Sequence, residues 1–438
     1  MRIGALALLL PIASCGWIAG LGSYGERGSD DAGTGMLSDA DAGSSGSASC
    51  VGALALGGKC PTSLTAGVGE TCVIAPDAMY CWGQNLLGTA ERADAAVKIE
   101  LSQTPISVQL SSTVDSPSTI GVGCYLEGSG NALTCWGDSS WGQAQILISN
   151  EPGKLIAPQG VTAYAVGADH VCATTEGFQT ILCWGRSDED QLDVANAGAA
   201  CNAGTCSLVY QQTPDVLTTG AFVAGGSHTC VGSNALGDAN DIACWGLNDK
   251  GQLGGDSGAG FDTVETVAST SGAGELGSAS ELALGADHTC ALVDGATYCW
   301  GANDQGQLGV MGATVTHFPL AVTHAPAFAH IAAGTNTTCA IDLSGNVWCW
   351  GDNVQGECGQ SGLLSGPIPQ TVFEPLKVPN VANATMIAVG DQHACAELAN
   401  GDIMCWGDDT NGELGDNKQM DSSCSLGPCS PNPVLVTK

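Results

Sequence analysis

The chemistry most evident in this sequence is that of cysteine. The chain holds 22 Cys among 438 residues, and seven copies of the tripeptide Cys-Trp-Gly each follow another Cys at a distance of nine to fourteen residues. Two Cys on neighbouring strands of one antiparallel hairpin lie close enough to form a disulfide. The spacing therefore predicts seven disulfides: Cys72–Cys81, Cys124–Cys135, Cys172–Cys183, Cys230–Cys244, Cys290–Cys299, Cys339–Cys349 and Cys395–Cys405.

Most of the other cysteines form short local pairs. Their spacing predicts the bridges Cys50–Cys60, Cys201–Cys206 and Cys424–Cys429. Cys358 is then left over. Because it stands where other repeats have Leu, we expect a buried free thiol, with an intermolecular disulfide as the alternative. So many disulfides suit an oxidising compartment.

Metal binding is the alternative for part of this pattern. Four histidines each precede a Cys by two residues: His170, His228, His288 and His393. They belong to separate repeats and no Cys-x-x-Cys pair accompanies them, so they do not predict a zinc site. The acidic runs 188–190 and 408–409 could bind Ca²⁺, but they lack the full alternating ligand series of a calcium loop. We expect solvated turns there instead.

No set of residues forms a catalytic constellation. The segment 255–258, Gly-Asp-Ser-Gly, matches the surroundings of a trypsin-like nucleophile, but it directly follows the turn of a repeat and other protease landmarks are missing. The sequence also lacks a Walker A loop, a dinucleotide-binding GxGxxG motif and a zincin helix. We therefore predict that the chain is not an enzyme and uses no cofactor.

The elements that hold these residues form a repeat. The Trp residues of the seven Cys-Trp-Gly motifs stand 48 to 61 residues apart, and seven such units fill residues 60–438. The clearest unit, 282–309, alternates apolar runs of period two with Gly, Asn and Asp turns, which is typical of short antiparallel strands. The pattern predicts an all-β chain, a seven-bladed β-propeller of four-stranded antiparallel blades. The motif tryptophans should pack between blades, whereas Trp17 and Trp141 break register and are freer for a functional role.

The repeat resembles a known family. The pattern xxAxGxxHTCAL…GxxxCWGxNxxGQLG looks like the regulator of chromosome condensation repeat, with GQLG at 251–254 and 306–309, GECG at 356–359 and GELG at 412–415. The resemblance implies a seven-bladed propeller over about residues 60–438, with the four His as turn residues whose rings bond backbone. Eukaryotic members are exchange factors for a small nuclear GTPase and bind chromatin, a bacterial relative is a secreted β-lactamase inhibitor, and others are modules of surface proteins.

The ends of the chain suggest how the ring closes. Most units are interpreted as beginning with a Pro-containing strand, such as 318–322, but the first unit has no convincing one. The chain instead ends with an apolar, Pro-containing segment, 433–436, that no unit follows. We therefore predict that this C-terminal strand completes the first blade and closes the ring.

The N-terminal region predicts export and lipid attachment. Residues 1–14 contain an apolar run of ten, which is the size of a signal-peptide core and too short to span a bilayer. The residues before Cys15 resemble a lipobox, so we predict a lipoprotein signal peptide and lipidation of Cys15, with an ordinary secretory peptide as the alternative. Residues 15–49, rich in Gly, Ser, Ala and Asp, are predicted to be a flexible tether to the propeller at 50–438.

Charge limits the partners that this protein can have. The formal net charge of −33 argues against nucleic acid, whose phosphates attract basic proteins. We expect an exported bacterial lipoprotein at the outer membrane or cell surface, monomeric, touching the membrane only through its lipid. We expect it to bind a protein, and its charge favours one with a basic surface. The expected contacts are inter-strand loops at 87–104, 186–213, 254–262 and 360–374. The alternatives are a secreted inhibitor of a periplasmic or extracellular enzyme and, by resemblance only, a guanine nucleotide exchange factor.

Overall fold

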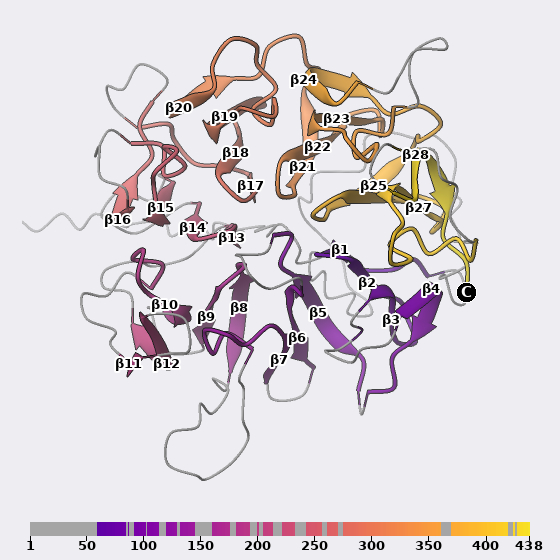
Figure 1. Cartoon of the computed structure of the whole chain (residues 1–438), viewed down its shortest axis with the longest axis horizontal. Helices are drawn as coiled ribbons and strands as arrows, with labels where there is room; N and C mark the ends of the chain where they lie inside the picture. The colour runs from indigo at the N-terminus through magenta and orange to yellow at the C-terminus, as the bar shows by residue number, and fades with distance from the viewer. Residues whose placement is uncertain are drawn as a thin grey trace, which may run out of the picture.

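Seven small antiparallel sheets stand around a central channel in a computed structural model of the chain (Figure 1). The structure describes residues 59–438 except 85, 87–91, 102, 114–119, 129–131, 145–159, 176–180, 193–198, 201–204, 213–220, 233–241, 256–260, 270–274, 361–368, 419–423 and 425–426. The predicted all-β, seven-bladed propeller is confirmed. Within the described residues, no helix is long and apolar enough to cross a membrane.

Each blade runs outward from the channel as a meander of neighbouring strands. Blades 1 to 3 comprise β1 (Ser63–Ala66), β2 (Glu70–Ile74), β3 (Met79–Gln84) and β4 (Arg92–Lys98); β5 (Pro105–Leu110), β6 (Val122–Glu127) and β7 (Leu133–Gly137); and β8 (Val161–Val166), β9 (His170–Thr175), β10 (Ile181–Arg186), β11 (Ala199–Ala200) and β12 (Thr205–Gln212). Blades 4 and 5 comprise β13 (Phe222–Ala224), β14 (His228–Val231), β15 (Ala243–Leu247) and β16 (Phe261–Thr266); and β17 (Glu281–Leu284), β18 (His288–Val293), β19 (Ala296–Ala302) and β20 (Val315–Ala321). Blades 6 and 7 comprise β21 (Phe328–Ala333), β22 (Thr337–Asp342), β23 (Val347–Asp352) and β24 (Thr371–Lys377); and β25 (Ala384–Val389), β26 (His393–Leu398), β27 (Ile403–Asp408) and β28 (Cys429–Leu435).

The strand order corrects the predicted start of each unit. The Pro-containing strand β20 pairs with β19, which precedes it, and forms the outer edge of its blade. It is therefore the last strand of a unit and not the first. The reason is local: the Cys-Trp-Gly strand offers its free edge to the segment that returns from the loop directly after it. Blade 2 shows three strands among the described residues, and blade 3 carries the additional short strand β11.

The prediction that the C-terminal strand completes the first blade is wrong. Strand β28 pairs with β27 inside blade 7, and blade 1 has its own outer strand, β4. The residues beside β28 still close the ring. The Ala96 N–H donates to the Thr437 carbonyl at 2.8 Å, and the Thr437 N–H donates to the Gly415 carbonyl at 2.9 Å. The two ends of the propeller are therefore joined by backbone bonds between complete blades.

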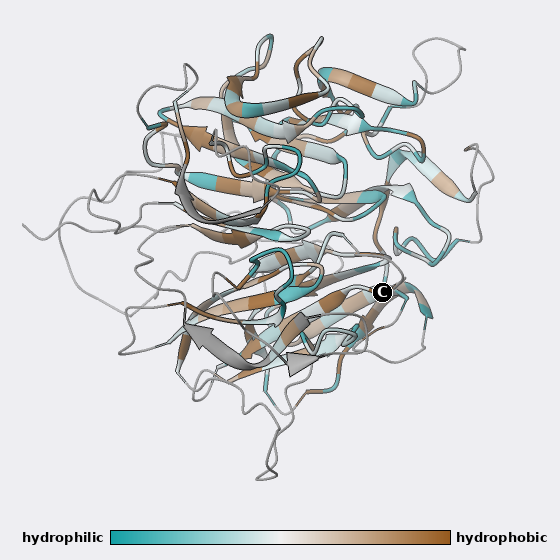
Figure 2. Cartoon of the chain, turned by 60° about the vertical axis from the view of Figure 1, so that its left-hand side comes forward, coloured by the Kyte–Doolittle hydropathy of each residue, from teal (hydrophilic) through white to brown (hydrophobic). Residues whose placement is uncertain are grey.

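The motif tryptophans fill the spaces between blades, as predicted. Six of them are completely buried: Trp82, Trp184, Trp245, Trp300, Trp350 and Trp406. Each of these donates its indole N–H to a backbone carbonyl of the preceding blade, at 2.7 to 3.0 Å. Apolar clusters accordingly span neighbouring blades, and apolar segments run along the strands while polar ones gather in the loops (Figure 2). Burying an indole side chain between neighbouring blades stabilises the closed propeller.

A glycine follows each of these tryptophans for a steric reason. In blade 5, Gly301 has a φ of +101°, and a Cβ there would lie 2.4 Å from the Asp287 carbonyl oxygen. The next residue, Ala302, donates its N–H to that same carbonyl at 2.8 Å. The pairing with β20 shifts register at this point, which is a β-bulge. Only glycine fits this bulge, so the third residue of Cys-Trp-Gly is fixed by the backbone.

Each of the seven predicted blade pairs forms a disulfide in the structure, with Cα–Cα distances of 4.0 to 4.2 Å. Cys424 and Cys429 are also bonded. Cys60 and Cys206 are disulfide-bonded as well, but their predicted partners, Cys50 and Cys201, lie outside the described residues. So do the signal peptide 1–14, Cys15, Trp17 and the tether 15–49, which stay predictions.

Candidate binding face around the channel

One face of the ring is built from two sets of connections. We call it the loop face: the turn between the first two strands of every blade, and the loop that follows every Cys-Trp-Gly strand. In all seven blades the residue after the motif glycine donates its N–H to the carbonyl of that turn, the donors being Gln84, Asp138, Arg186, Leu247, Ala302, Asp352 and Asp408. Turn and loop are thus fixed to each other, which makes the loop face a rigid rim around the channel.

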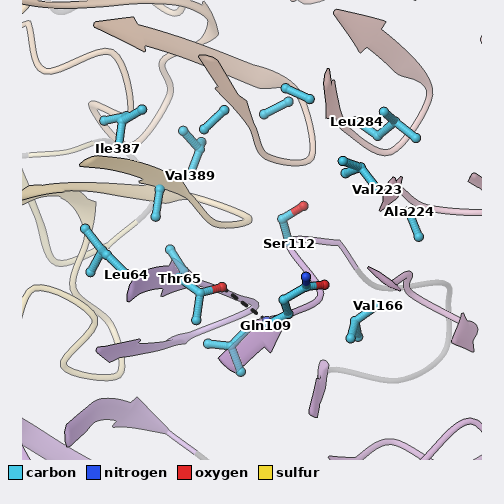
Figure 3. A pocket seen from close by; sticks show the side chains of 16 residues that line it. Leu64, Thr65, Gln109, Ser112, Val166, Val223, Ala224, Leu284, Ile387 and Val389 are labelled. Atoms are coloured by element: carbon cyan, nitrogen blue, oxygen red, sulfur yellow. Dashed lines mark hydrogen bonds between the residues drawn. The ribbon is translucent and has the colours of Figure 1, made fainter. Parts of the chain in front are cut away.

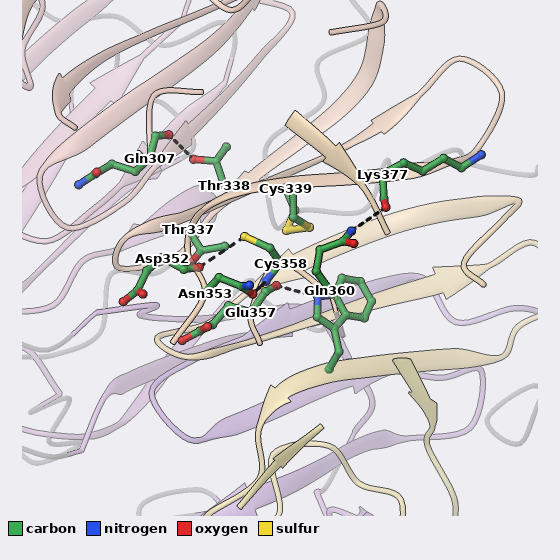
Figure 4. The surroundings of a disulfide bond; sticks show 12 residues. Gln307, Thr337, Thr338, Cys339, Asp352, Asn353, Glu357, Cys358, Gln360 and Lys377 are labelled. Atoms are coloured by element: carbon green, nitrogen blue, oxygen red, sulfur yellow. Dashed lines mark hydrogen bonds between the residues drawn. A yellow bond between two sulfur atoms is a disulfide. The ribbon is translucent and has the colours of Figure 1, made fainter. Parts of the chain in front are cut away.

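A buried apolar residue anchors the loop in each of blades 5 and 6, and we call its position the plug. In blade 5 the Asn303 side-chain oxygen accepts the N–H of Leu308, which is completely buried. In blade 6 the same position is Cys358, whose N–H donates to the Asn353 side chain at 2.9 Å (Figure 4). Cys358 is free and fully buried, so the prediction of a buried free thiol is confirmed. Burial, followed by the nearby carboxyl groups of Glu357 and Asp352, raises the pKa of this thiol, which keeps it protonated.

The residue before the plug connects the loop to its surroundings. In blades 2 to 5 it is a buried glutamine: Gln143, Gln191, Gln252 and Gln307. Its side-chain oxygen accepts an N–H of its own loop, and its amide nitrogen donates to a nearby aspartate. Blades 6 and 7 have Glu357 and Glu413 instead. These keep the loop bond, at 2.9 and 2.7 Å, but an ionised carboxylate has no hydrogen to donate.

The four histidines of the repeat connect neighbouring blades. Each ring Nε2 lies 2.7 to 2.9 Å from a threonine hydroxyl of the next blade, in the pairs His170–Thr229, His228–Thr289, His288–Thr338 and His393–Thr71. The expectation that these rings bond backbone is therefore wrong. Burial lowers the pKa of His228 and His288 to about 3 and that of His393 to about 4, so these rings are neutral. The repeat places one such bond at four of the blade contacts.

One of these pairs has the components of a catalytic triad. Asp169 Oδ1 lies 3.0 Å from His170 Nδ1, and His170 Nε2 lies 2.7 Å from Thr229 Oγ1. This order of acid, imidazole and hydroxyl is that of serine hydrolases. All three side chains are completely buried, however, and Ser227 and Gln191 donate to the other Asp169 oxygen. No substrate can reach the hydroxyl, so the arrangement is structural.

The contact between blades 1 and 2 uses different residues. Glu70 replaces the histidine, and Gly123 replaces the threonine of the next blade. A Cβ at Gly123 would lie 2.2 Å from the Trp136 ring, whose indole N–H donates to Glu70 Oε1 at 3.3 Å. Burial raises the pKa of Glu70 to about 8, opposed by the bond from Trp136. The degenerate second repeat thus holds its tryptophan with a side chain where the others use a carbonyl.

The central channel is narrow and largely apolar. It has a volume of about 100 Å³ and is lined by the inner strands of all seven blades (Figure 3). Thr65, Gln109 and Ser112 are its polar residues, and the Thr335 hydroxyl of blade 6 donates to the Ser112 carbonyl of blade 2 at 3.0 Å. Pockets for cofactors and drug-sized ligands are several times larger. Binding by large ligands must therefore use the loop face or the loops of the opposite face.

The predicted acidic runs are placed on the loop face and are not simple solvated turns. Arg186 pairs with Asp188 and Glu189, and its guanidinium lies 4.9 Å from the ring centre of Trp141. Trp141 is only 7% exposed, which argues against the functional role expected for it. The second run, 408–409, is buried in the loop of blade 7. Within the described residues, no group of three or more His, Cys, Asp or Glu side chains is arranged to hold a metal ion.

Comparison with known families agrees with this architecture. Models of the regulator of chromosome condensation (RCC1) repeat match residues 294–341, 328–360 and 386–413, which fall in blades 5 to 7. Residues 294–360 and 386–413 therefore carry RCC1 repeats. Two solved structures share the fold of this propeller at 18% identity: Prp20p of Saccharomyces cerevisiae, with a TM-score of 0.58 over 77% of this chain and 82% of that one, and human WBSCR16, with a TM-score of 0.52 over 72% and 79%.

Two curated relatives are similar in sequence. The ultraviolet-B receptor UVR8 of Arabidopsis thaliana is 28% identical over 317 residues, which is 69% of this chain and 66% of the receptor. The probable E3 ubiquitin-protein ligase HERC4 of Homo sapiens is 29% identical over 188 residues, 42% of this chain and 17% of the ligase. The RCC1 propeller thus corresponds to less than two thirds of either relative.

Proposed function

We propose that this RCC1 propeller binds another protein through its loop face. The observation that carries the proposal is a row of exposed acids on a rigid rim. Asp188, Asp249 and Asp304 are exposed and occupy the same position in blades 3, 4 and 5, four residues after the motif tryptophan. Rigid scaffolds that display loops are common binding surfaces. In this proposal the chain is a binding protein and not an enzyme.

The charge of the molecule indicates the kind of partner. With a net charge of −33, the protein attracts cationic surfaces and accelerates their association. Work on Prp20p concerns its binding to Gsp1p and to histones, and Prp20 has also been solved bound to Kap60. A protein with a basic surface is therefore the partner that we propose here as well. An enzyme inhibited by the propeller would be a special case of such a partner.

The location that we propose for this binding is outside the cytoplasm. The seven blade disulfides favour an oxidising compartment, and the N-terminal residues fit a lipoprotein signal with Cys15 as the lipidated residue. The propeller would then hang as a monomer from the outer membrane or cell surface by the 15–49 tether. Labelling with a palmitate analogue tests this: a Cys15→Ala variant should carry no label, and an unchanged label would refute lipidation at this residue.

A photo-crosslinking residue tests the binding face itself. Asp304 and Asp294 are both exposed and stand at opposite ends of β19, so they report on opposite faces of blade 5. Incorporated at position 304 in living cells, the crosslinker should capture a discrete partner, which mass spectrometry identifies. The same crosslinker at position 294 is the matched control. Equal capture at both positions would refute the assignment to the loop face.

A further inference from the structure

Four carboxyl groups are crowded where blades 6 and 7 meet on the loop face. Asp352 and Glu357 belong to the loop of blade 6, whereas Asp391 and Asp408 belong to the turn and the loop of blade 7. Burial, then the charges of Asp352 and Asp408, raise the pKa of Glu357 to about 8. Burial likewise raises the pKa of Asp391, and the charges of Asp408 and Asp352 add to it. Asp352 and Asp408 therefore each lie within electrostatic reach of both Glu357 and Asp391.

No base compensates these acids within the part of the chain that the structure describes. Three other places on the loop face have one: Arg186 pairs with acids of blade 3, and Lys250 pairs with Asp249 in blade 4. Arg92 of blade 1 pairs with Asp94 and reaches the loop of blade 7, where it donates to the Thr410 carbonyl at 2.8 Å. None of the ion pairs in the described residues includes Asp352, Glu357, Asp391 or Asp408. The sector between blades 6 and 7 is thus acidic and uncompensated.

A buried amide provides independent support for a ligand. Gln355 is only 3% exposed, and its amide nitrogen donates to Asp408 Oδ1 at 3.0 Å, which places the amide group among the carboxyl groups. Its side-chain oxygen, also buried, has no hydrogen-bond partner within the described residues. A buried acceptor without a donor destabilises the folded protein. The missing partner is therefore a hydrogen-bond donor.

The fold itself does not require an acid in this place. The residue equivalent to Glu357 is glutamine in blades 2 to 5, where its amide donates to an aspartate (Gln307 to Asp304 at 3.4 Å, for example). Glu357 keeps the bond to its own loop and places an additional ionisable carboxyl group beside Asp352, its neighbour in Figure 4. The extra acid is best explained by something that binds it.

We propose that the Asp352–Glu357–Asp391–Asp408 sector binds the guanidinium or ammonium group of an Arg or Lys side chain on the partner protein. Such a cation carries several N–H donors, which suit a set of carboxylates and the free Gln355 oxygen together. Asp352 and Asp391 are partly exposed and accessible to a partner, whereas Asp408 and Gln355 are buried. The described side chains offer no metal-binding arrangement, which favours an organic cation. This assignment rests on the proposed protein-binding function.

A peptide probe tests the assignment with the full-length protein. A fluorescent hexa-arginine peptide is titrated against the wild type and the double variant Glu357→Gln, Asp391→Asn, at physiological salt. We expect affinity to fall at least fivefold. Because glutamine is the native residue of blades 2 to 5 at this position, the variant should fold, which an unchanged circular dichroism spectrum verifies. A comparison variant, Asp249→Asn, Asp304→Asn, removes two charges from the exposed acidic row of the same face and should lower affinity by a smaller factor than the first double variant does.

The outcomes separate this inference from the function on which it rests. An equal or larger loss in the comparison variant would overturn the assignment to this sector but leave the loop face as the binding surface. The control variant Asp294→Asn, Asp402→Asn changes the turns between β18 and β19 and between β26 and β27, on the opposite face. If it lost as much affinity as the others, the proposal that the loop face binds the partner would be refuted as well. Displacement of the peptide from this sector by CaCl₂ at equimolar concentration would assign the site to a metal and overturn the inference.

Discussion

Glu357→Gln should stabilise the protein above neutral pH. A glutamate whose pKa rises from 4.5 unfolded to about 8 folded stays protonated in the native loop while the unfolded chain ionises. The free energy of unfolding is therefore undiminished below pH 4.5 and falls as the pH rises through about 8. A shift of this size corresponds to about 5 kcal/mol in a rigid site. Because nearby side chains and water relieve part of the cost of a buried carboxylate, we expect the variant to gain about 2–3 kcal/mol at pH 8.5.

The gain in the free energy of unfolding has to be measured in a pH range in which the histidines do not titrate. His228, His288 and His393 have folded pKa values lowered to between about 3 and 4, so their contribution is complete above their unfolded pKa of 6.5 and is lost as the pH falls. Between about pH 7.5 and 8.5 these rings are almost entirely neutral in both states, and the change with pH comes from buried glutamates. Glu357 shares that window with Glu70, Glu397 and Glu413.

Urea unfolding at pH 7.5 and 8.5 measures this effect. The wild type should lose stability across the series, and Glu357→Gln should lose less, with the difference between the two proteins growing with pH. The control is Glu100→Gln, an exposed glutamate after β4, which should leave the slope unchanged. If Glu357→Gln follows the wild-type slope, or destabilises the protein at pH 8.5, the reasoning about the buried carboxyl is refuted.

Three further predictions concern the framework. Deleting residues 432–438 should lower the melting temperature by more than about 10 °C, because it removes half of β28 and the Thr437 bond to blade 1. Calorimetry measures the change, with deletion of Lys438 alone as the control. A shift below about 2 °C would contradict the prediction. Thr338→Val should lower the free energy of unfolding by about 1–3 kcal/mol, because it leaves His288 Nε2 buried without its partner. The control is Thr323→Val at an exposed position, and equal denaturation midpoints for the two variants would contradict the prediction. Cys358 should resist a maleimide reagent in native protein and react after unfolding, and rapid native labelling seen by mass spectrometry would show that it is accessible.

The sequence was informative wherever a feature recurs in every unit. Seven Cys-Trp-Gly motifs with a second Cys at hairpin distance require a hairpin of nearly constant length, and this predicted both the propeller and the blade disulfides. The buried Cys358 was likewise predictable, because the repeat shows that its position is a leucine.

The order of strands within a blade could not be decided from the sequence. The strand 315–321 lies between two motif strands along the chain, and either could pair with it. Only the hydrogen bonds decide, with Ala321 opposite Tyr298 in the preceding strand. The error about the C-terminal strand follows from this ambiguity, since a unit that begins with its outer strand leaves one strand over at the end.

The contacts between blades were also beyond the sequence. His288 and Thr338 are 50 residues apart and belong to different repeats, so no local pattern joins them. The acidic sector combines residues of two blades, Glu357 and Asp408 among them. One signal was present in the sequence: the change from GQLG to GECG and GELG at 356–359 and 412–415, which replaces an amide by an acid at a position that the fold buries.

The central claim is that the loop face binds a basic partner, and charge reversal tests it most directly. The partner captured from the crosslinker at position 304 is purified, and its affinity is measured by calorimetry against two variants of the full chain. Asp249→Lys, Asp304→Lys should weaken binding at least tenfold, whereas the opposite-face variant Asp294→Lys, Asp402→Lys should change it less than twofold. Unchanged affinity in the first variant, or an equal loss in both, would contradict the claim.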